Sequence, residues 1–294
     1  MKRDFAERLE SAIIESTSVQ KAVRPIDNWL NRCFQSKLLH PIKLLGNGGW
    51  LGHPLHPLLT DVPVGAWTVT ILLDLIALIF NVETGPAASA AAALGVLAAL
   101  AAAGAGLMDW LDVNPPEKAL GAVHAIVNVT ATVLFAISVA MRSSHGWQTT
   151  PAAFLVALAG YLTLTLGAFL GGSMVFRMGV MINRNAYRSG PDDFTQALPA
   201  SELSEGKLQK VMVGEEPVLF VKRGDQIFAV GAVCSHYGAP LEEGKLLDGA
   251  IECPWHASRF NLKDGSVRQG PACAALPSYE VRVAGGQVQV RRRA

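Results

Sequence analysis

The chain has 294 residues, of which 50% are hydrophobic and 17% are charged, and its formal net charge at pH 7 is +1. A soluble protein carries about 25% charged residues, so the deficit indicates a membrane protein. The near-zero net charge gives no indication of a nucleic-acid partner, and we expect none. The length allows for two domains.

Residues 1–50 form a polar N-terminal region. Charged side chains such as Glu7 and Glu10 are interleaved with apolar ones such as Leu9 and Ile13. This pattern predicts an amphipathic helix. Such a helix either lies on a membrane surface or packs on its own protein as a solvated lead-in, and we expect the second.

Four apolar stretches follow within residues 51–181, which we interpret as a transmembrane domain. They run over residues 62–80, 87–108, 119–141 and 152–176. Each is close to the ~20 residues that cross a ~30 Å hydrocarbon core. The second is rich in Ala and Gly, which suits close packing between helices. The alternative is a set of buried helices in a soluble protein, but four such stretches in succession favour a membrane bundle.

Lys and Arg flank these stretches unevenly. Several lie before the first stretch and after the fourth, among them Lys43 and Arg177, whereas the loop between the third and fourth has only Arg142. Because positively charged residues favour the cytoplasmic side, we predict a multi-pass protein of the cell membrane with both termini in the cytoplasm.

The last third of the chain has a different period. Residues 182–200 are polar and turn-rich and predict a linker. In residues 201–294 apolar residues alternate with polar ones, and Gly224-Asp225 and Gly285-Gly286 each separate two such runs. This pattern predicts two hairpins and an antiparallel, all-β domain.

Two short segments of this β domain carry the chemistry. They read Cys234-x-His236 and, sixteen residues later, Cys253-x-x-His256. Each segment offers one thiolate and one imidazole, the ligand set of a Rieske [2Fe–2S] cluster, in which two cysteines bind one iron and two histidines the other. The alternative is a tetrahedral Cys₂His₂ zinc site. Zinc sites usually pair like with like, so the mixed pairing favours iron–sulfur.

With these motifs, residues 205–291 resemble the ferredoxin-like branch of the Rieske domain family. The extra cysteines of the Rieske proteins of cytochrome bc complexes are absent, because Ala239 and Trp255 occupy those positions. The resemblance implies a hydroxyl near the cluster at Ser258, but Phe260 stands where a tyrosine would be. We therefore expect a potential toward the low end of the range of about −150 to +300 mV.

Residues 45–182 resemble a family of prokaryotic four-span membrane proteins of uncharacterised function. The resemblance rests on the segment Gly52–Asp61, which contains His56, and on His124 with Asn128. Polar groups at membrane depth are costly and usually functional. Either His56 and His124 ligate a haem b, or they belong to a quinone or metal site, or they only cap helices and form hydrogen bonds. Asp74 has no partner that the sequence identifies.

The function predicted from these features is that of a membrane-anchored one-electron carrier. No histidine follows His256 in the sequence, so we do not expect the two-histidine, one-carboxylate iron site of a self-contained Rieske oxygenase. The electron would pass to or from an unidentified protein, a quinone or a haem. Two alternatives stay open: a tethered ferredoxin-like donor for a separate oxygenase or reductase, and a non-enzymatic redox sensor.

Overall fold

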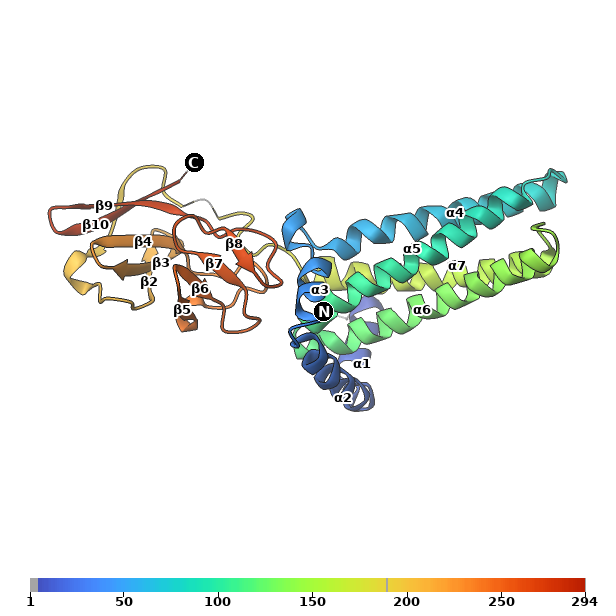
Figure 1. Ribbon diagram of the computed structural model, residues 1–294, viewed down its shortest axis with the longest axis horizontal. Helices are drawn as coiled ribbons and strands as arrows, with labels where there is room; N and C mark the ends of the chain where they lie inside the picture. Colours follow the sequence, from blue (N-terminus) through green and yellow to red (C-terminus); the bar gives the residue numbers. More distant parts are fainter. Residues whose placement is uncertain (1–4, 189, 294) are drawn as a thin grey trace. The chain divides into compact units, whose positions relative to one another are not determined.

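The computed structural model describes residues 5–188 and 190–293. Residues 1–4 of the predicted N-terminal region, residue 189 of the predicted linker and residue 294 lie outside the described residues. The chain forms two compact units (Figure 1). The helical unit comprises residues up to Gly46 and Leu55–Val180, and the β unit comprises Asn47–Pro54 and the residues from Met181 onward.

Three shorter helices open the helical unit: α1 (Phe5–Ile14), α2 (Thr17–Phe34) and α3 (His40–Gly46). Their charged side chains pair with residues near the ends of the long helices. The pairs are Glu10 with Arg177 at 3.0 Å, Lys43 with Asp112 at 2.6 Å, and Asp27 with Lys118. The amphipathic N-terminal helices are therefore attached to the bundle of their own chain.

Four long helices make up the bundle: α4 (Leu55–Phe80), α5 (Gly85–Leu111), α6 (Pro115–Ser144) and α7 (Pro151–Gly172), the last continued by a π-helical turn, Ser173–Arg177. All four are long and apolar enough to cross a membrane, which confirms the four predicted stretches. They pair as two hairpins, α4–α5 and α6–α7 (Figure 1). Trp67 of α4 stacks on Phe135 of α6 with ring centroids 4.2 Å apart and joins the hairpins.

A fully buried ion pair lies near the end of α4. Arg142 of α6 donates from Nη1 to Asp74 Oδ1 at 2.8 Å and also contacts Asp74 through Nη2. The hydroxyl of Thr149 donates to the same carboxylate at 2.7 Å. The sequence left Asp74 without a partner and placed Arg142 in a loop. The helix in fact continues past Arg142, so the guanidinium turns inward and supplies the missing countercharge.

Among its described residues the β unit has ten strands: β1 (Thr195–Pro199), β2 (Gln209–Val213), β3 (Glu216–Arg223), β4 (Gln226–Gly231), β5 (Lys245–Leu247), β6 (Ala250–Glu252), β7 (Arg259–Asn261), β8 (Val267–Gln269), β9 (Tyr279–Ala284) and β10 (Gln287–Arg292). They form three antiparallel sheets, in the orders β1-β10-β9, β2-β3-β4 and β5-β6-β7-β8. The fold class, a helical membrane bundle with an all-β domain, is confirmed. Strand β1 lies inside the segment that was expected to be a linker.

Both predicted hairpins are present. Strands β3 and β4 join through Gly224-Asp225, and β9 and β10 join through Gly285-Gly286. The two glycines of the second turn have φ values of 58° and 77°, the left-handed conformations that a tight two-residue turn requires. One core packs β3 and β4 against the loops that follow β4 and β6, and these loops carry the two Cys/His segments.

Candidate metal centre

The first Cys/His segment is a tight loop between β4 and a short 3₁₀ turn, Leu241–Glu243. The N–H of Cys234 donates to the carbonyl of Ala239 at 2.9 Å, and the N–H of Gly238 donates back to the carbonyl of Cys234 at 2.9 Å. Gly238 has a φ of 80°, which favours glycine at this point. The loop thus closes on itself and fixes the direction of the side chains between these residues.

The second segment connects β6 to β7 and repeats this construction. The N–H of Cys253 donates to the carbonyl of Ser258 at 2.8 Å, and the N–H of Ala257 donates to the carbonyl of Cys253 at 3.2 Å. Ala257 has a φ of 55° and is left-handed, like Gly238 in the first loop. Two loops with the same backbone hydrogen bonds therefore present one cysteine and one histidine each.

The two cysteines lie together and are buried, with exposed fractions of 1% for Cys234 and 3% for Cys253. Each sulfur accepts two main-chain N–H groups from the residues that follow it in its loop. A hydrogen bond from the Cys234 thiol lowers the pKa of Cys253 to about 7, whereas this bond and burial raise the pKa of Cys234. The N–H groups directed at sulfur stabilise negative charge there, as metal-binding thiolates require.

The two histidines also lie together. The ring centroids of His236 and His256 are 5.0 Å apart, and the ring planes are nearly perpendicular at 86°. A metal–nitrogen bond of about 2.0–2.1 Å, plus about 1.15 Å from nitrogen to ring centre, places each centroid about 3.2 Å from a shared metal. Two such ligands at a tetrahedral angle have centroids about 5.2 Å apart. The observed separation of 5.0 Å is compatible with two imidazoles on one tetrahedral metal.

This donor set fits a binuclear cluster. Two thiols form one pair and two imidazoles form the other, as a Rieske [2Fe–2S] cluster requires. In the described part of the chain, no three His, Cys, Asp or Glu side chains gather closely enough to hold one metal ion. A tetrahedral Cys₂His₂ zinc site would need all four ligands around one point. The contact of thiol with thiol and of imidazole with imidazole fits two metals, each with its own ligand pair.

A third loop, which contains Gly270 and Ala272, packs against the second ligand loop. The buried hydroxyl of Ser258 accepts the N–H of Ala272 at 3.1 Å. A Cβ at Gly270 would lie 2.5 Å from Cα of Ser258, so glycine is required at this close approach. Ser258 therefore anchors this third loop, whereas Phe260 is buried in the core and offers no hydroxyl.

Sequence reasoning missed several residues that support the first ligand loop. Ser235 donates its hydroxyl to the carbonyl of Ala274 at 2.6 Å. The ring of Tyr237 packs edge-on against His236, with centroids 4.7 Å apart. The amide of Asn185 donates to the carbonyl of Val233 at 2.9 Å. Ser235 and Tyr237 could have been found as neighbours of the ligands, but Asn185 could not, because it is distant in sequence.

In the helical unit, the structure brings together His56 and His124. Their ring centroids are 6.4 Å apart, and Asn128 lies beside His124. His53 is not part of this cluster, because it is exposed and belongs to the β unit. Arg177, which follows the fourth apolar stretch, pairs with Glu10 of α1 at 3.0 Å.

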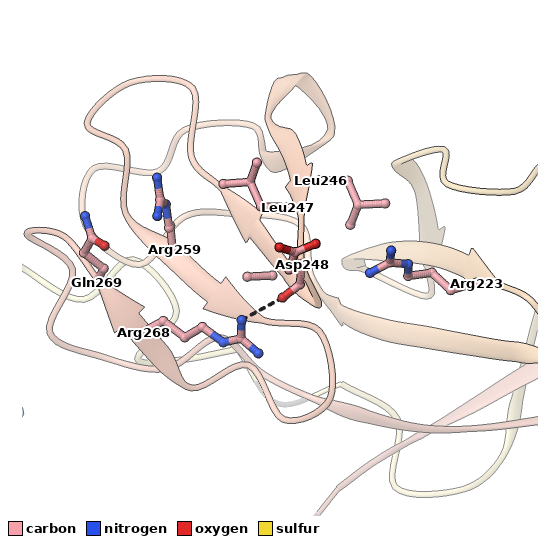
Figure 2. A pocket seen from close by; sticks show the side chains of 8 residues that line it. Arg223, Leu246, Leu247, Asp248, Arg259, Arg268 and Gln269 are labelled. Atoms are coloured by element: carbon pink, nitrogen blue, oxygen red, sulfur yellow. Dashed lines mark hydrogen bonds between the residues drawn. The ribbon is translucent and has the colours of Figure 1, made fainter.

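An open groove of about 580 Å³ lies on the sheet β5-β6-β7-β8 (Figure 2). It is lined in part by three arginines, and Arg268 donates from Nη1 to the carbonyl of Asp248 at 2.8 Å, the dashed line in Figure 2. None of the four predicted cluster ligands lines this groove, so it is separate from the metal centre.

The β unit has relatives of known kind. Apoptosis-inducing factor 3 of Homo sapiens is 35% identical over 103 residues, which cover 34% of this chain and 17% of that protein. The anthranilate 1,2-dioxygenase ferredoxin subunit of Burkholderia cepacia is 32% identical over 99 residues, which cover 34% of this chain and 83% of that protein. The solved ferredoxin of carbazole 1,9a-dioxygenase from Nocardioides aromaticivorans IC177 is 27% identical with a TM-score of 0.33, over 34% of this chain and 98% of that chain.

Two family models cover most of the sequence. Residues 193–280 match the Rieske [2Fe-2S] domain, and residues 52–184 match a family of predicted membrane proteins, DUF2231. These matches and the pairing of thiols and imidazoles agree on a [2Fe–2S] cluster in the β unit. The chain therefore belongs to the Rieske [2Fe–2S] family through its β unit, and its helical unit matches the model of the DUF2231 predicted membrane proteins.

Proposed function

We propose that the protein is a membrane-anchored one-electron carrier in which Cys234 and Cys253 hold one iron and His236 and His256 hold the other. The observation that supports this most is the separation of the ligands into a thiol pair and an imidazole pair with centroids 5.0 Å apart. When bound, a [2Fe–2S] cluster with these ligands supplies a single-electron couple.

The surroundings of the two cysteines differ from those of the two histidines. Main-chain N–H groups stabilise the charge on the two sulfurs, which are buried away from water. The histidine side is more open: His256 is half-buried, and the neighbouring Trp255 is 51% exposed. An exposed tryptophan next to a ligand is the kind of residue that anchors a protein contact. We therefore place the docking of the electron partner at the tip of this loop.

The reduction potential should lie toward the low end of the Rieske range. Hydrogen bonds to the cluster sulfurs raise the potential of such centres. Ser258 accepts the N–H of Ala272 and so keeps its own O–H as a donor, whereas Phe260 lacks a hydroxyl and cannot supply such a bond. A potential above about +200 mV in a redox titration would contradict this expectation.

The helical unit anchors the carrier, with both termini in the cytoplasm. The one arginine near the α6–α7 connection is Arg142, and it is buried against Asp74. The opposite end of the helices carries Lys118 and Arg177. This asymmetry supports the predicted orientation under the positive-inside rule. In this proposal His56 and His124 form a haem or quinone site that exchanges the electron.

A second candidate is a tethered electron donor for a separate oxygenase. It is favoured by the likeness of the β unit to the ferredoxin subunit of anthranilate 1,2-dioxygenase. The two candidates share the cluster and its ligands and differ only in the partner. A redox-active cofactor in the helical unit favours the first.

The cluster assignment is tested by the iron and sulfide content of the full chain purified anaerobically in detergent. We expect two irons and two sulfides per chain. Cys253→Ser should abolish both, because the thiolate cannot be replaced by a hydroxyl. Cys273→Ser is the matched control, because Cys273 lies outside both Cys/His segments, and it should retain the cluster. A colourless, zinc-loaded wild-type protein would refute the assignment.

A further inference from the structure

His56 and His124 oppose each other within the helical unit. His56 lies in the first turn of α4 and His124 in the third turn of α6, and both are half-buried. Their ring planes stand at 85° to each other. Polar side chains among apolar membrane helices are costly, so a pair arranged in this way calls for a function.

The hydrogen bonds of the two rings fix their tautomers. Nδ1 of His56 lies 2.8 Å from the carbonyl of Ala102 in α5, and Nδ1 of His124 lies 2.9 Å from the carbonyl of Gly167 in α7. A carbonyl oxygen only accepts, so Nδ1 carries the proton in each neutral ring. Nε2 of both rings therefore keeps its lone pair, which is the usual state of a metal-binding histidine with a backbone partner.

The separation of the rings selects a coordination geometry. With each centroid about 3.2 Å from a shared metal, two imidazoles at opposite sides have centroids about 6.4 Å apart, and two at a tetrahedral angle about 5.2 Å. The observed value is 6.4 Å for His56 and His124. The separation of this pair is thus compatible with trans ligands of one metal, whereas the 5.0 Å of His236 and His256 is not.

The trans geometry indicates which ligand completes the site. In the described residues no third His, Cys, Asp or Glu joins the pair to make a protein cage for a bare ion. An iron porphyrin brings four nitrogen donors of its own and leaves two positions for a pair of imidazoles. A quinone carbonyl would need an N–H donor, whereas Nε2 offers a lone pair. We propose that His56 and His124 are the two axial ligands of a haem b, an inference that deepens the proposed electron-carrier function.

Glycines let each ring lie against the neighbouring helix of its own hairpin. A Cβ at Gly106 of α5 would stand 2.8 Å from Cε1 of His56, and a Cβ at Gly171 of α7 would stand 2.9 Å from Cε1 of His124. Both distances are too short for a real side chain. The small residues thus hold the Nδ1 edge of each ring at the helix that supplies its carbonyl partner.

Asn128 is the residue to distinguish from a ligand. Its Nδ2 donates to the main-chain carbonyl of His124 at 2.8 Å and lies 3.4 Å from His124 Nε2. If the pair served only to form hydrogen bonds within the bundle, this amide would be a partner of His124 beside the carbonyl of Gly167. Under the haem assignment Asn128 is a positioning residue, and Asn128→Leu should bind haem more weakly but keep low-spin spectra.

The test begins with the full chain expressed with added iron and 5-aminolevulinate and purified in detergent. Pyridine haemochrome analysis should give one haem b per chain. The oxidised protein should show a strongly anisotropic low-spin ferric EPR signal, because the two imidazole planes are nearly perpendicular. No haem in a wild-type preparation that contains its [2Fe–2S] cluster would overturn the haem site and leave the carrier proposal intact.

Variants identify the ligands. His56→Ala and His124→Ala should each lower the haem content at least tenfold, and imidazole added to the growth medium or buffer should restore low-spin spectra. His145→Ala, which changes an exposed histidine outside the pair, should keep the full haem content. Equal haem loss in His145→Ala, or unchanged content in both ligand variants, would overturn the assignment. Cys253→Ser should lose the cluster and keep the haem, so that the two proposals fail separately.

Discussion

His236 and His256 lie on loops of the β unit with ring centroids 5.0 Å apart, whereas His56 and His124 lie on long helices with centroids 6.4 Å apart. Each loop is closed by its own main-chain hydrogen bonds within six residues. The helical pair is held by carbonyls of neighbouring helices. The first pair is thus set by local chain geometry and the second by the packing of helices, so the two should respond differently to substitution.

The largest predicted effect is a loss of stability of the helical unit in Arg142→Met. This substitution leaves the carboxylate of Asp74 buried without its countercharge, and breaking a buried pair in this way costs about 3–5 kcal/mol. Thermal unfolding in detergent should show a much lower melting temperature for the helical unit. The [2Fe–2S] spectrum at low temperature should be unchanged.

The matched control is the double variant Asp74→Leu with Arg142→Met. Removing both charges should recover most of the lost stability, because no unpaired charge stays buried. A single Arg142→Met variant as stable as the wild type would show that the ion pair does not join the two hairpins. Loss of the cluster from this variant at low temperature would show that the site of His236 and His256 depends on the packing of the helical unit, which would contradict the account.

Features that lie within one short segment could be predicted from the sequence, whereas contacts between distant segments could not. The four candidate ligands could be proposed from the sequence because each Cys/His pair lies within one short segment. The β3–β4 and β9–β10 turns could be predicted because their glycines are diagnostic. Strands β5 to β8 have three residues each, too few for a period to appear. The partnership of Asp74 with Arg142 arises only from helix packing and was missed.

A smaller effect should come from Gly106→Ala, compared with Gly104→Ala in the same helix. A Cβ at Gly106 meets His56 at 2.8 Å, whereas a Cβ at Gly104 meets nothing within 4 Å. Alanine stabilises a helix by about 1 kcal/mol over glycine, so any haem loss at Gly106 comes from the displaced ring. We expect haem affinity to fall about tenfold, or about 1.4 kcal/mol, for Gly106→Ala. Haem titration of the two variants measures this difference in affinity. Equal affinities would contradict the packing of His56 on α5.

The smallest predicted effect is on the pH dependence of the stability of the β unit. Burial raises the pKa of Tyr279 to about 12. The folded protein therefore holds this proton more tightly than the unfolded chain, so its contribution is complete below about pH 10 and is lost as the pH rises toward 12. Tyr279→Phe should lose less stability between pH 9 and pH 11 than the wild type. The midpoint of thermal cluster bleaching measures this, and identical pH slopes would contradict the cause given.

The central claim is that a pair of imidazoles and a pair of thiolates bind different irons of one cluster in the β unit. Pulsed EPR of the reduced full chain in detergent tests it directly, because it detects nitrogen nuclei bound to the paramagnetic iron. The account predicts couplings from two histidine nitrogens in the wild type and their loss when His256 is replaced. A reduced cluster without histidine nitrogen couplings would contradict it.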